Sequence, residues 1–555
     1  MSKQKDNVRF ESLKTELQKW TSALKDLSQY IDPTRGIFDG DRTRIGKMIN
    51  HKILLDSHAT HAKRITASGM QTGMTDPSRP WFKLTVDNIL LESVPGVREW
   101  IDEVTRIMIE AMNKSNIYKV FQNCYDELVT FGTGCFLILD DFDDVIRGRS
   151  FTAGEYYLAT DNKGRVNRFA RSFEMTVDQL VQEFGLESVS PKVRAAYDNN
   201  QRQQSIKVRH LIEPNKDRDT QKTDYMNMPY RSCYWEEGDG TEQYLAKRGF
   251  RRFPVVAPRW DAITTDMVYG YGPGWHAIGD IKELQVTHKD MLIAQEKLGN
   301  PPLVEDSSVV GNTNKLPGGI TKTNSAVPNT GVRAAFQVDP RLDAFYNAIE
   351  FLHKKIDKHL FADIFLMISA SGDQAQTAFE IAKREQEKMM MLGPILHGLN
   401  EEMHDESIDI IFDIVADAGL IPPPPQEIEG MELKVQYISI LAQAQRALGV
   451  QAMDRVIGRV GNLAALGQPQ AWDNIDIDEL VRESSDMEGT PAKLVMDKAE
   501  VESIRQVRLE QQNKLMAMQA ANSGADTAQK LSQATVNGEE KNMLDVVGET
   551  AKAAR

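Results

Sequence analysis

The chain has 555 residues, of which 41% are hydrophobic and 26% charged, so it can fill ordinary globular cores. At roughly 150 residues per domain, we expect three or four structural units. Asp and Glu number 80 against 66 Lys and Arg, which gives a net charge of −14 and argues against a free-standing nucleic-acid binder. Any nucleic-acid role must depend on geometry or on local basic patches.

The three cysteines, Cys124, Cys135 and Cys233, form no CxxC pair, so we expect neither a disulfide framework nor a structural zinc site. The charged N-terminus lacks the apolar core of a signal peptide. The longest apolar stretches, such as 361–370, are too short to span a bilayer. We therefore expect a soluble protein from a reducing compartment, with no membrane partner.

The first 130 residues are predicted to be mainly helical. Leu13, Leu17, Leu24 and Leu27 recur on one helical face, and Asp32-Pro33 ends that helix. Alternation at 81–86 predicts a strand. Further helices are predicted at 50–70, 100–112 and 120–131.

From 134 to 259, short β-type segments separated by turn residues predict an α+β region with local antiparallel pairing rather than a βαβ series. One helix, at 177–183, interrupts them. The predicted strands lie at 135–139, 156–159, 166–169, 206–212, 232–235 and 253–257.

The middle of the chain is predicted to be a helix, a small β module and a second helix. The first helix covers 275–298 and is stopped by Asn300-Pro301-Pro302. Residues 301–340 are loop-rich, with short strands expected at 303–305 and 335–338. An amphipathic helix follows from Phe345 to Met367, with apolar residues every three or four positions. Its other face carries Lys354, Lys355 and Lys358.

A polar loop, from Ser369 to Gln374, separates this unit from a long helix predicted at 377–418. Gly393-Pro394 should kink that helix, because proline lacks the N–H and its ring clashes with the preceding turn. Residues 431–437 alternate like a strand. The remaining predicted helices are 441–448, 453–466 and 492–523, and the last thirty residues are expected to be loose.

Catalytic signatures are mostly missing. The segment from Gly40 to Lys47 is one residue too long for a phosphate-binding loop, and Met48 stands where Ser or Thr must ligate magnesium. The glycine clusters 132–134 and 270–274 lack dinucleotide spacing and favour tight turns. With no nucleophile beside a base, we predict no catalytic residues, no cofactor and no enzymatic activity.

Metal binding is the weaker interpretation of two acidic or histidine-bearing segments. His51, His58 and His61 with Asp56 lack fixed third and fourth ligands, so we favour polar-face histidines. The acids of 473–479 do not follow the order of a calcium loop and favour helix capping. We expect no metal site.

Charge is distributed unevenly. Residues 401–430 hold nine Asp or Glu and no Lys or Arg, so they form either a solvated acidic face or a surface that repels a polyanion or docks a basic partner. Lys354, Lys355 and Lys358 either keep the helix soluble or approach DNA.

Six stretches, in order along nearly the whole chain, resemble the head-to-tail connector (portal) proteins of short-tailed bacteriophages. Residue Phe379 departs from the resemblance, since relatives tend to carry Thr at this position. The stretches run from Thr66 to Phe82, from Asp126 to Cys135, from Tyr269 through Asp280-Ile281-Lys282 to Leu303, from Thr377 to Ile395, from Ile438 to Arg446, and from Pro491 to Leu494.

The resemblance implies an α+β, mainly helical portal fold, assembled as a ring with a central channel. Its parts would be a wing at 1–272, a first stem helix at 273–299, a clip at 300–340, a second stem helix at 341–368 and a tunnel loop at 369–376. A kinked wing helix and strand would cover 377–437, a crown 438–523, and a barrel or flexible tail 524–555. The tunnel-loop residues would be Ser369, Ser371, Gly372, Asp373 and Gln374.

The resemblance also implies function and partners. A homo-oligomer, expected to be a dodecamer, would sit at one capsid vertex of the virion after assembly in the host cytoplasm. It would nucleate the procapsid with scaffolding and major capsid proteins, dock the large terminase and later the tail adaptor, and pass double-stranded DNA.

Two alternatives remain at this point. A virion scaffold or internal structural protein would need no helix–clip–helix–loop order. A packaging ATPase would need a phosphate-binding loop.

Overall fold

A computed structural model describes the chain, which divides into two compact units, Met1–Leu448 and Gly449–Arg555. The described residues are 3–38, 54–86, 94–222, 224–305, 309–313, 321–322, 324, 332–334, 341–370, 392–431, 433–439, 456–462, 475–478, 480 and 498–533.

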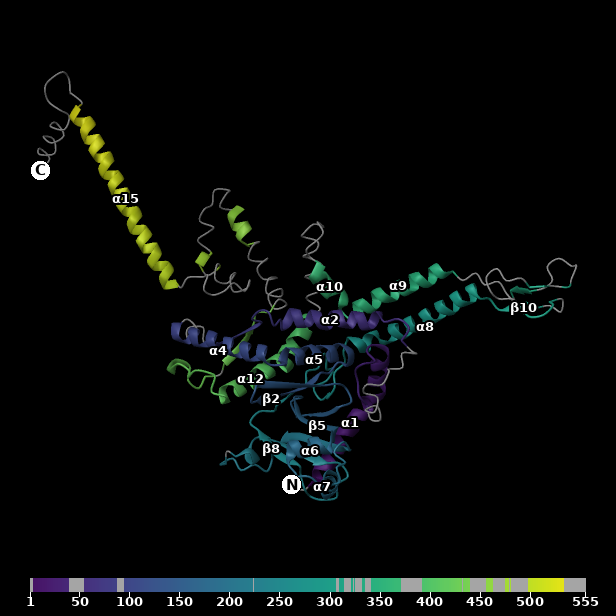
Figure 1. Ribbon diagram of the computed structural model, residues 1–555. Coiled ribbons are helices and arrows are strands. Elements are labelled where there is room, and N and C mark those ends of the chain that lie inside the picture. The colour runs from purple at the N-terminus through teal and green to yellow at the C-terminus, as the bar shows by residue number, and fades with distance from the viewer. Residues whose placement is uncertain are drawn as a thin grey trace. The chain divides into compact units, whose positions relative to one another are not determined.

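Four helices near the N-terminus carry much of the core of the first unit (Figure 1). Leu13, Leu17, Leu24 and Leu27 are buried along one face, which confirms the predicted amphipathic pattern. The second helix begins at His58, later than the predicted residue 50. The helices are α1 (Lys3–Tyr30), α2 (His58–Met74), α4 (Pro95–Lys114) and α5 (Ile117–Phe131).

The described strands pair only antiparallel, as the local spacing predicted. One sheet has the order β3-β2-β9, formed by β3 (Val145–Phe151), β2 (Cys135–Asp141) and β9 (Val255–Val256). A five-stranded sheet has the order β4-β5-β6-β7-β8. Its strands are β4 (Tyr156–Thr160), β5 (Val166–Thr176), β6 (Ser205–Pro214), β7 (Tyr230–Glu236) and β8 (Ala246–Phe250).

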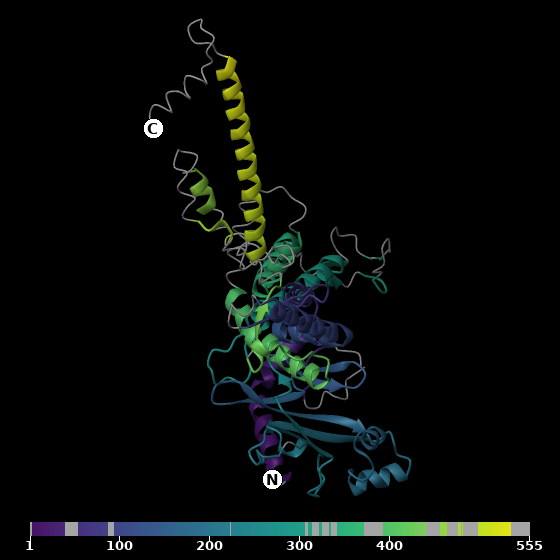
Figure 2. The same cartoon turned by 90° about the vertical axis from the view of Figure 1, so that its left-hand side faces the viewer.

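The five-stranded sheet is covered on both faces (Figure 2). On one face, Phe10 of α1 packs edge-on against Trp235 of β7, with ring centroids 6.0 Å apart. On the other, α6 (Val177–Phe184) and α7 (Pro191–Asp198) enclose a separate small core around Val193 and Val208. Thr176 and Gln179 form a capping box that starts α6.

Three of these elements, β3, β8 and α7, were missed by the sequence-based prediction. Strand β3 reads Val-Ile-Arg-Gly-Arg-Ser-Phe and strand β8 reads Ala-Lys-Arg-Gly-Phe. Each lies at the edge of its sheet, where charged outward-facing residues protect the unpaired side and weaken the apolar signal. Tertiary pairing, rather than local propensity, determines these strands.

A two-stranded sheet joins distant parts of the first unit. Strand β1 (Phe82–Val86) pairs with β12 (Leu433–Tyr437), in register Phe82 to Tyr437. Both strands were expected, but their pairing was not, because nearly 350 residues separate them. Trp81, just before β1, is 1% exposed and donates a hydrogen bond from its indole to the Tyr118 hydroxyl at 3.2 Å.

A helical hairpin follows the sheets. Helix α8 (Pro273–Gly299) and helix α9 (Leu342–His359) pack side by side, and β10 (Leu303–Glu305) pairs with β11 (Val332–Ala334) near their ends (Figure 1). The predicted strand at 303–305 is confirmed, whereas the one at 335–338 lies outside the described residues.

The predicted single helix from 341 to 368 is wrong. Leu360 and Phe361 interrupt it, and α10 (Ala362–Ala370) begins after the break. Phe361 has φ +61°, a left-handed conformation that bulky residues rarely adopt and that breaks helical geometry. The apolar spacing continues through the break, which is why periodicity alone did not reveal it.

The long helix predicted at 377–418 is helical where it is described, from residue 392 onward. Asn400–Asp405 forms a π-helical segment, which leads into α12 (Glu406–Asp417). Gly393 and Pro394 lie in the described helical part, but the residues before 392 are not described, so the predicted kink stays a prediction. The π-helical segment was not expected.

In the second unit, residues 456–462 are helical, and α15 (Lys498–Gln533) is a long helix. Most of its described apolar side chains, among them Leu509 and Leu515, are exposed, while Val501 is half-buried. The helix crosses the boundary predicted at 523/524, so the last thirty residues are not loose as far as Gln533. The assignment of 524–555 to a barrel or a flexible tail stays a prediction. Ala and Gln, which are frequent in this segment, are good helix formers.

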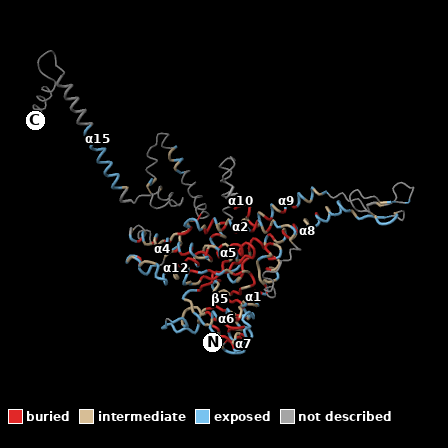
Figure 3. The backbone as a smooth tube through the Cα atoms, viewed as in Figure 1, coloured by how far each residue is buried: buried red, intermediate tan, exposed pale blue. Residues whose placement is uncertain are grey.

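Buried residues concentrate around α5, β2 and β5, while the far part of the α8–α9 hairpin is mostly exposed (Figure 3). Among the described residues, no helix combines the length and apolar character needed to cross a membrane.

Candidate functional site: a helical hairpin and its anchorage

The α8–α9 hairpin is fully buried near its base and more exposed farther along. Ile281 and Leu284 of α8 and Ile356 of α9 are fully buried. Farther along, Met291 of α8 and Ile349 and Leu352 of α9 are still buried, but most other side chains are open to solvent. The exposed large apolar residues of the hairpin are Val286 (59%), Leu292 (43%), Ile293 (37%) and Leu298 (54%) on α8, and Tyr346 (52%) and Phe351 (66%) on α9. A helix pair with this exposure has an incomplete apolar interface.

Helix α8 starts from two glycine clusters that pack against each other. Gly132 ends α5 with φ +86°, and a Cβ there would lie 2.4 Å from the Gly272 backbone nitrogen. Gly270 donates its N–H to the Thr133 hydroxyl at 2.8 Å. Trp275 donates its indole N–H to the Phe131 carbonyl at 2.7 Å. Both clusters are therefore tight turns, and together they fix where α8 begins.

A second anchor joins the segment before α2 to both hairpin helices. Asp56 accepts a hydrogen bond from the His353 ring of α9 at 2.9 Å, and the His288 ring of α8 lies 3.4 Å away. The His58 ring contacts Asp357 of α9 at 2.8 Å. The His58 and His353 rings stack with centroids 4.0 Å apart. Asp56 thus contacts α8 and α9 at once.

Electrostatics strengthens the same contact. Burial alone raises the pKa of Asp56, but hydrogen bonds from the His58 backbone N–H and the His353 ring, with the nearby histidine charges, hold that pKa below its ordinary value. The side-chain oxygen of Gln285, a buried residue of α8, accepts hydrogen bonds from the backbone N–H groups of Leu55 and Asp56 at 2.7 and 2.9 Å. The carboxylate form of Asp56 is therefore the form that holds the hairpin.

The break between α9 and α10 is held by α2. The Thr66 hydroxyl donates a hydrogen bond to the Leu360 carbonyl at 2.6 Å. Carbonyls at the end of a helix have no partner within the helix, so this bond supplies one. Phe365 of α10 packs directly over Gly69, where an added Cβ would lie 2.3 Å from the Phe365 ring. Only glycine at position 69 leaves room for α10 in this position.

The three predicted lysines are all exposed on α9, but they have different partners. Lys354 pairs with Glu350 of its own helix at 2.7 Å. Lys355 pairs with Asp280 of α8, which also lies 3.3 Å from His359. Lys358 has no ion pair with any described residue. Lys355 thus links the two helices, while Lys354 and Lys358 keep their charges at the surface.

Of the predicted tunnel-loop residues, Ser369 lies within α10. Its placement in a loop is therefore wrong, because α10 continues to Ala370. Ser371, Gly372, Asp373 and Gln374 lie outside the described residues.

The histidines near α2 do not gather into a metal site in the described part of the chain. His58 pairs with Asp357, His61 is exposed, and His51 lies outside the described residues. No group of three His, Cys, Asp or Glu with suitable geometry occurs among the residues that the structure describes.

The sequence-based prediction missed the residues that anchor the hairpin. Thr66 and Gly69 lie in the first stretch quoted for the family resemblance, and their spacing was the available signal. The roles of Asp56, Gln285 and His353 had no such signal, since each lies on a different element and their contacts arise only from the packing.

Comparisons with known proteins agree with one another. The model of a family described as "Bacteriophage head to tail connecting protein" matches residues 3–495. The chain is 38% identical over 527 residues to the "Probable portal protein" of Bordetella phage BPP-1, covering 94% of both chains. It is 36% identical over 522 residues to the "Portal protein" of Salmonella phage epsilon15, again covering 94% of both.

Proposed function

We propose a ring-shaped conduit for DNA as the working form of this chain, which belongs to the bacteriophage head-to-tail connecting protein family. The chain is a portal protein of a tailed phage, a structural component of the virion and not an enzyme. The ring, its subunit number, its channel and its individual partners are the parts that we propose. We propose a dodecamer at one capsid vertex.

The observation that carries the proposal is the α8–α9 hairpin. Its base is buried and anchored by Asp56, Gln285 and His353, while its far part exposes apolar side chains on both helices. Copies arranged around an axis would cover those side chains, and a closed ring leaves no copy with an uncovered face. We assign α8 and α9 to the stem and 300–340 to the clip.

The charge of the chain suits a passage through which DNA slides. Strong phosphate binding would stall the duplex, and each copy brings a net charge of −14. Screening over roughly 8 Å at physiological salt limits the repulsion to groups near the wall. Lysines placed sparsely along the wall would lower the barrier without holding the DNA.

Lys354 and Lys358 are the cations that we assign to the DNA path, with Lys355 as a link between the stem helices. Both assigned lysines are exposed, whereas Lys355 is engaged by Asp280. Replacing Lys354 and Lys358 by Glu should reduce the packaged length of DNA or its retention. Replacing Lys289 and Lys297, which are exposed on α8, by Glu changes the charge equally and serves as the control. Unchanged packaging in the double variant would remove this assignment.

The clip, residues 300–340, is where we place the contacts with the large terminase and then with the tail adaptor. The described part forms a small exposed β-hairpin beyond the stem, with Leu303 and Val304 open to solvent. Deleting the clip should abolish binding of both partners in pull-down measurements. Retention of both by the deleted chain would move these contacts elsewhere.

The remaining assignments follow the family order. We place the tunnel loop at 371–376, now without Ser369, and the wing at 1–272 together with 377–437. The crown and barrel are assigned to the second unit, and the wing is proposed to meet the scaffolding and major capsid proteins. Cross-linking in procapsids, read by mass spectrometry, should give wing peptides joined to those two proteins.

Electron microscopy of the purified protein, with mass photometry of the same sample, tests the ring directly. Closed rings with a central hole and the mass of a dodecamer are expected. Because some rings assemble only with a scaffolding protein, a monomeric sample is repeated with that protein present. A chain that stays monomeric there would overturn the proposal.

A further inference from the structure

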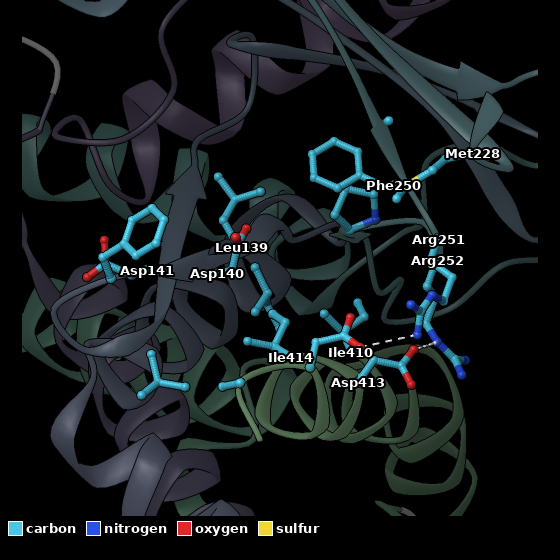
Figure 4. A pocket seen from close by; sticks show the side chains of 17 residues that line it. Leu139, Asp140, Asp141, Met228, Phe250, Arg251, Arg252, Ile410, Asp413 and Ile414 are labelled. Atoms are coloured by element: carbon cyan, nitrogen blue, oxygen red, sulfur yellow. Dashed lines mark hydrogen bonds and ion pairs between the residues drawn. The ribbon is translucent and has the colours of Figure 1, made fainter. Parts of the chain in front are cut away.

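A groove on the wing lies between the β2–β3 hairpin, the segment after β8 and α12 (Figure 4). Its volume is about 530 Å³, within the range of sites that accept side chains or small ligands. Leu139, Ile410 and Ile414 contribute to an apolar floor. Neither the stem nor the clip lines this groove, so it does not belong to the proposed conduit.

The two ends of the groove differ in charge. At one end, Arg252 pairs with Asp413 at 2.9 Å and with Asp409 at 2.8 Å, and Arg251 pairs with Asp417 at 3.3 Å (Figure 4). These contacts use the two arginines that line the groove. The acidic stretch, for which a solvated face, repulsion of a polyanion and docking of a basic partner were all open, thus pairs in part with arginines of its own chain.

The other end, at the tip of the β2–β3 hairpin, stays acidic. Asp140 is exposed and has no side-chain partner among the described residues, and Asp141 lies beside it. Asp143 at the tip is exposed in the same way. Arg147 pairs with Asp144 at the same tip at 3.7 Å, but Asp140 and Asp141, which line the groove, have no ion pair among the described residues. They therefore complement a basic group on whatever enters.

Two further features of the hairpin tip favour an interaction surface. Phe142 is fully exposed, so its ring extends the apolar area beyond the groove. Val145, which lines the groove, has φ +68°, a strained conformation for a β-branched residue. Such strain persists where the surrounding structure enforces it, and it holds the tip in this position.

We propose that this groove binds a segment of a partner protein that places an apolar side chain on the floor and a lysine or arginine against Asp140. Nucleic acid is a poor occupant, because its phosphates would meet the acidic end. A second copy is a weaker complement than a basic partner, since the chain has a net charge of −14. The groove is thus a docking site for a basic, amphipathic peptide segment.

Synthetic peptides test the site on the full chain by fluorescence anisotropy at roughly 0.15 M salt. The first peptide, of about twelve residues, has Leu and Lys at helical spacing, so one face is apolar and the other basic. A Leu–Glu peptide of the same pattern and a Ser–Lys peptide of the same charge are the comparisons. Only the Leu–Lys peptide should bind well, because the groove requires both properties.

Two matched pairs of variants locate the binding. Ala418→Trp fills the groove, whereas Ala416→Trp places the same side chain on an exposed position of α12 that does not line it. Asp140→Lys reverses the acidic end, whereas Glu174→Lys reverses an exposed acid of β5 outside the groove. Each groove variant should weaken the Leu–Lys peptide about tenfold or more, and each control should leave it unchanged.

Several outcomes would overturn the proposal. Equal binding of the Ser–Lys peptide, or equal losses in groove and control variants, would show attraction to net charge alone. If the Leu–Lys peptide does not bind while Ala418→Trp abolishes self-association in mass photometry, the occupant is a second copy. Thermal unfolding checks that each variant is folded, and if Ala418→Trp is not, the Asp140→Lys pair decides.

Discussion

The first unit consists of the α8–α9 hairpin and of its remaining helices and sheets, which we call the body. The body and the hairpin differ in how they use charged side chains. In the body, Lys63 of α2 is 1% exposed and pairs with Asp32 at 2.7 Å and Asp126 at 2.8 Å. Arg35 extends the same network to Asp126 and Glu127 of α5. On the hairpin, Lys354 and its partner Glu350 are both mostly exposed.

The difference shows in which part of the molecule the charged side chains find their partners within one chain. A buried ionic network needs all its members, because any charge left alone in the interior is costly. An exposed pair is screened by water and contributes little. The body is therefore stabilised by its own contacts, while the hairpin has charges and apolar side chains available for other molecules.

The largest effect is expected in the body. Lys63→Ala removes the most buried cation from the network and leaves Asp32 and Asp126 with Arg35 alone. It should lower the free energy of unfolding by about 3–5 kcal/mol. Urea denaturation measures it, with Lys19→Ala as the control, since Lys19 pairs with Glu16 at the surface. A loss below about 1 kcal/mol would mean that the buried network is not complete in solution.

His404 should make the body sensitive to acid. Burial lowers its pKa to about 3, and its neutral ring contacts the Tyr125 hydroxyl at 2.9 Å and the Asn400 side chain at 2.8 Å. Because this pKa is below the unfolded value of about 6.5, the stabilisation is complete above that pH and is lost as pH falls toward 3.

The expected loss is roughly 2–3 kcal/mol at about pH 4.5. Urea denaturation at about pH 7.5 and 4.5 should show the advantage of the parent chain over His404→Gln shrinking by this amount. His61→Gln, at an exposed position, is the control. A difference between parent and His404→Gln that does not change with pH would show that the pKa of His404 is the same in the folded and unfolded states, so that burial does not keep the ring neutral.

Gly69 of α2 lies against Phe365 of α10, the helix that follows directly after the hairpin. Gly69→Ala forces Phe365 and α10 to move and should cost about 1–3 kcal/mol in the free energy of unfolding. Gly279→Ala, within α8 and with open space at its Cβ, should instead stabilise the chain by about 0.5–1 kcal/mol. If Gly69→Ala also stabilised, α10 would not rest on α2 in solution.

The smallest effect is expected on the hairpin surface. Lys354→Ala removes an exposed pair within α9, so the midpoint of thermal unfolding of the isolated chain should not change measurably. A clear drop in that midpoint would mean that the hairpin contributes to the stability of the body, and the contrast between the two regions would fail.

The candidate site was predicted only in part. The turn residues on either side identified α8, and the spacing of apolar residues identified α9. The lysines Lys354, Lys355 and Lys358 are exposed as expected. Helical periodicity could not show the break at Phe361, because Leu360 and Ile364 keep the same spacing on both sides of it. Nor could it separate Lys355, which links two helices, from its neighbours.

The sequence by itself determined the antiparallel α+β character, the order of helix, small β module and helix, and the family. Local patterns suffice for these, because apolar periodicity and turn residues act over a few positions. Only the tertiary structure decided that β1 pairs with β12, that Asp56 contacts α8 and α9, and that Arg251 and Arg252 neutralise one end of an acidic groove. Each of these contacts joins residues more than 150 positions apart, and it forms because packing brings opposite charges or complementary edges together.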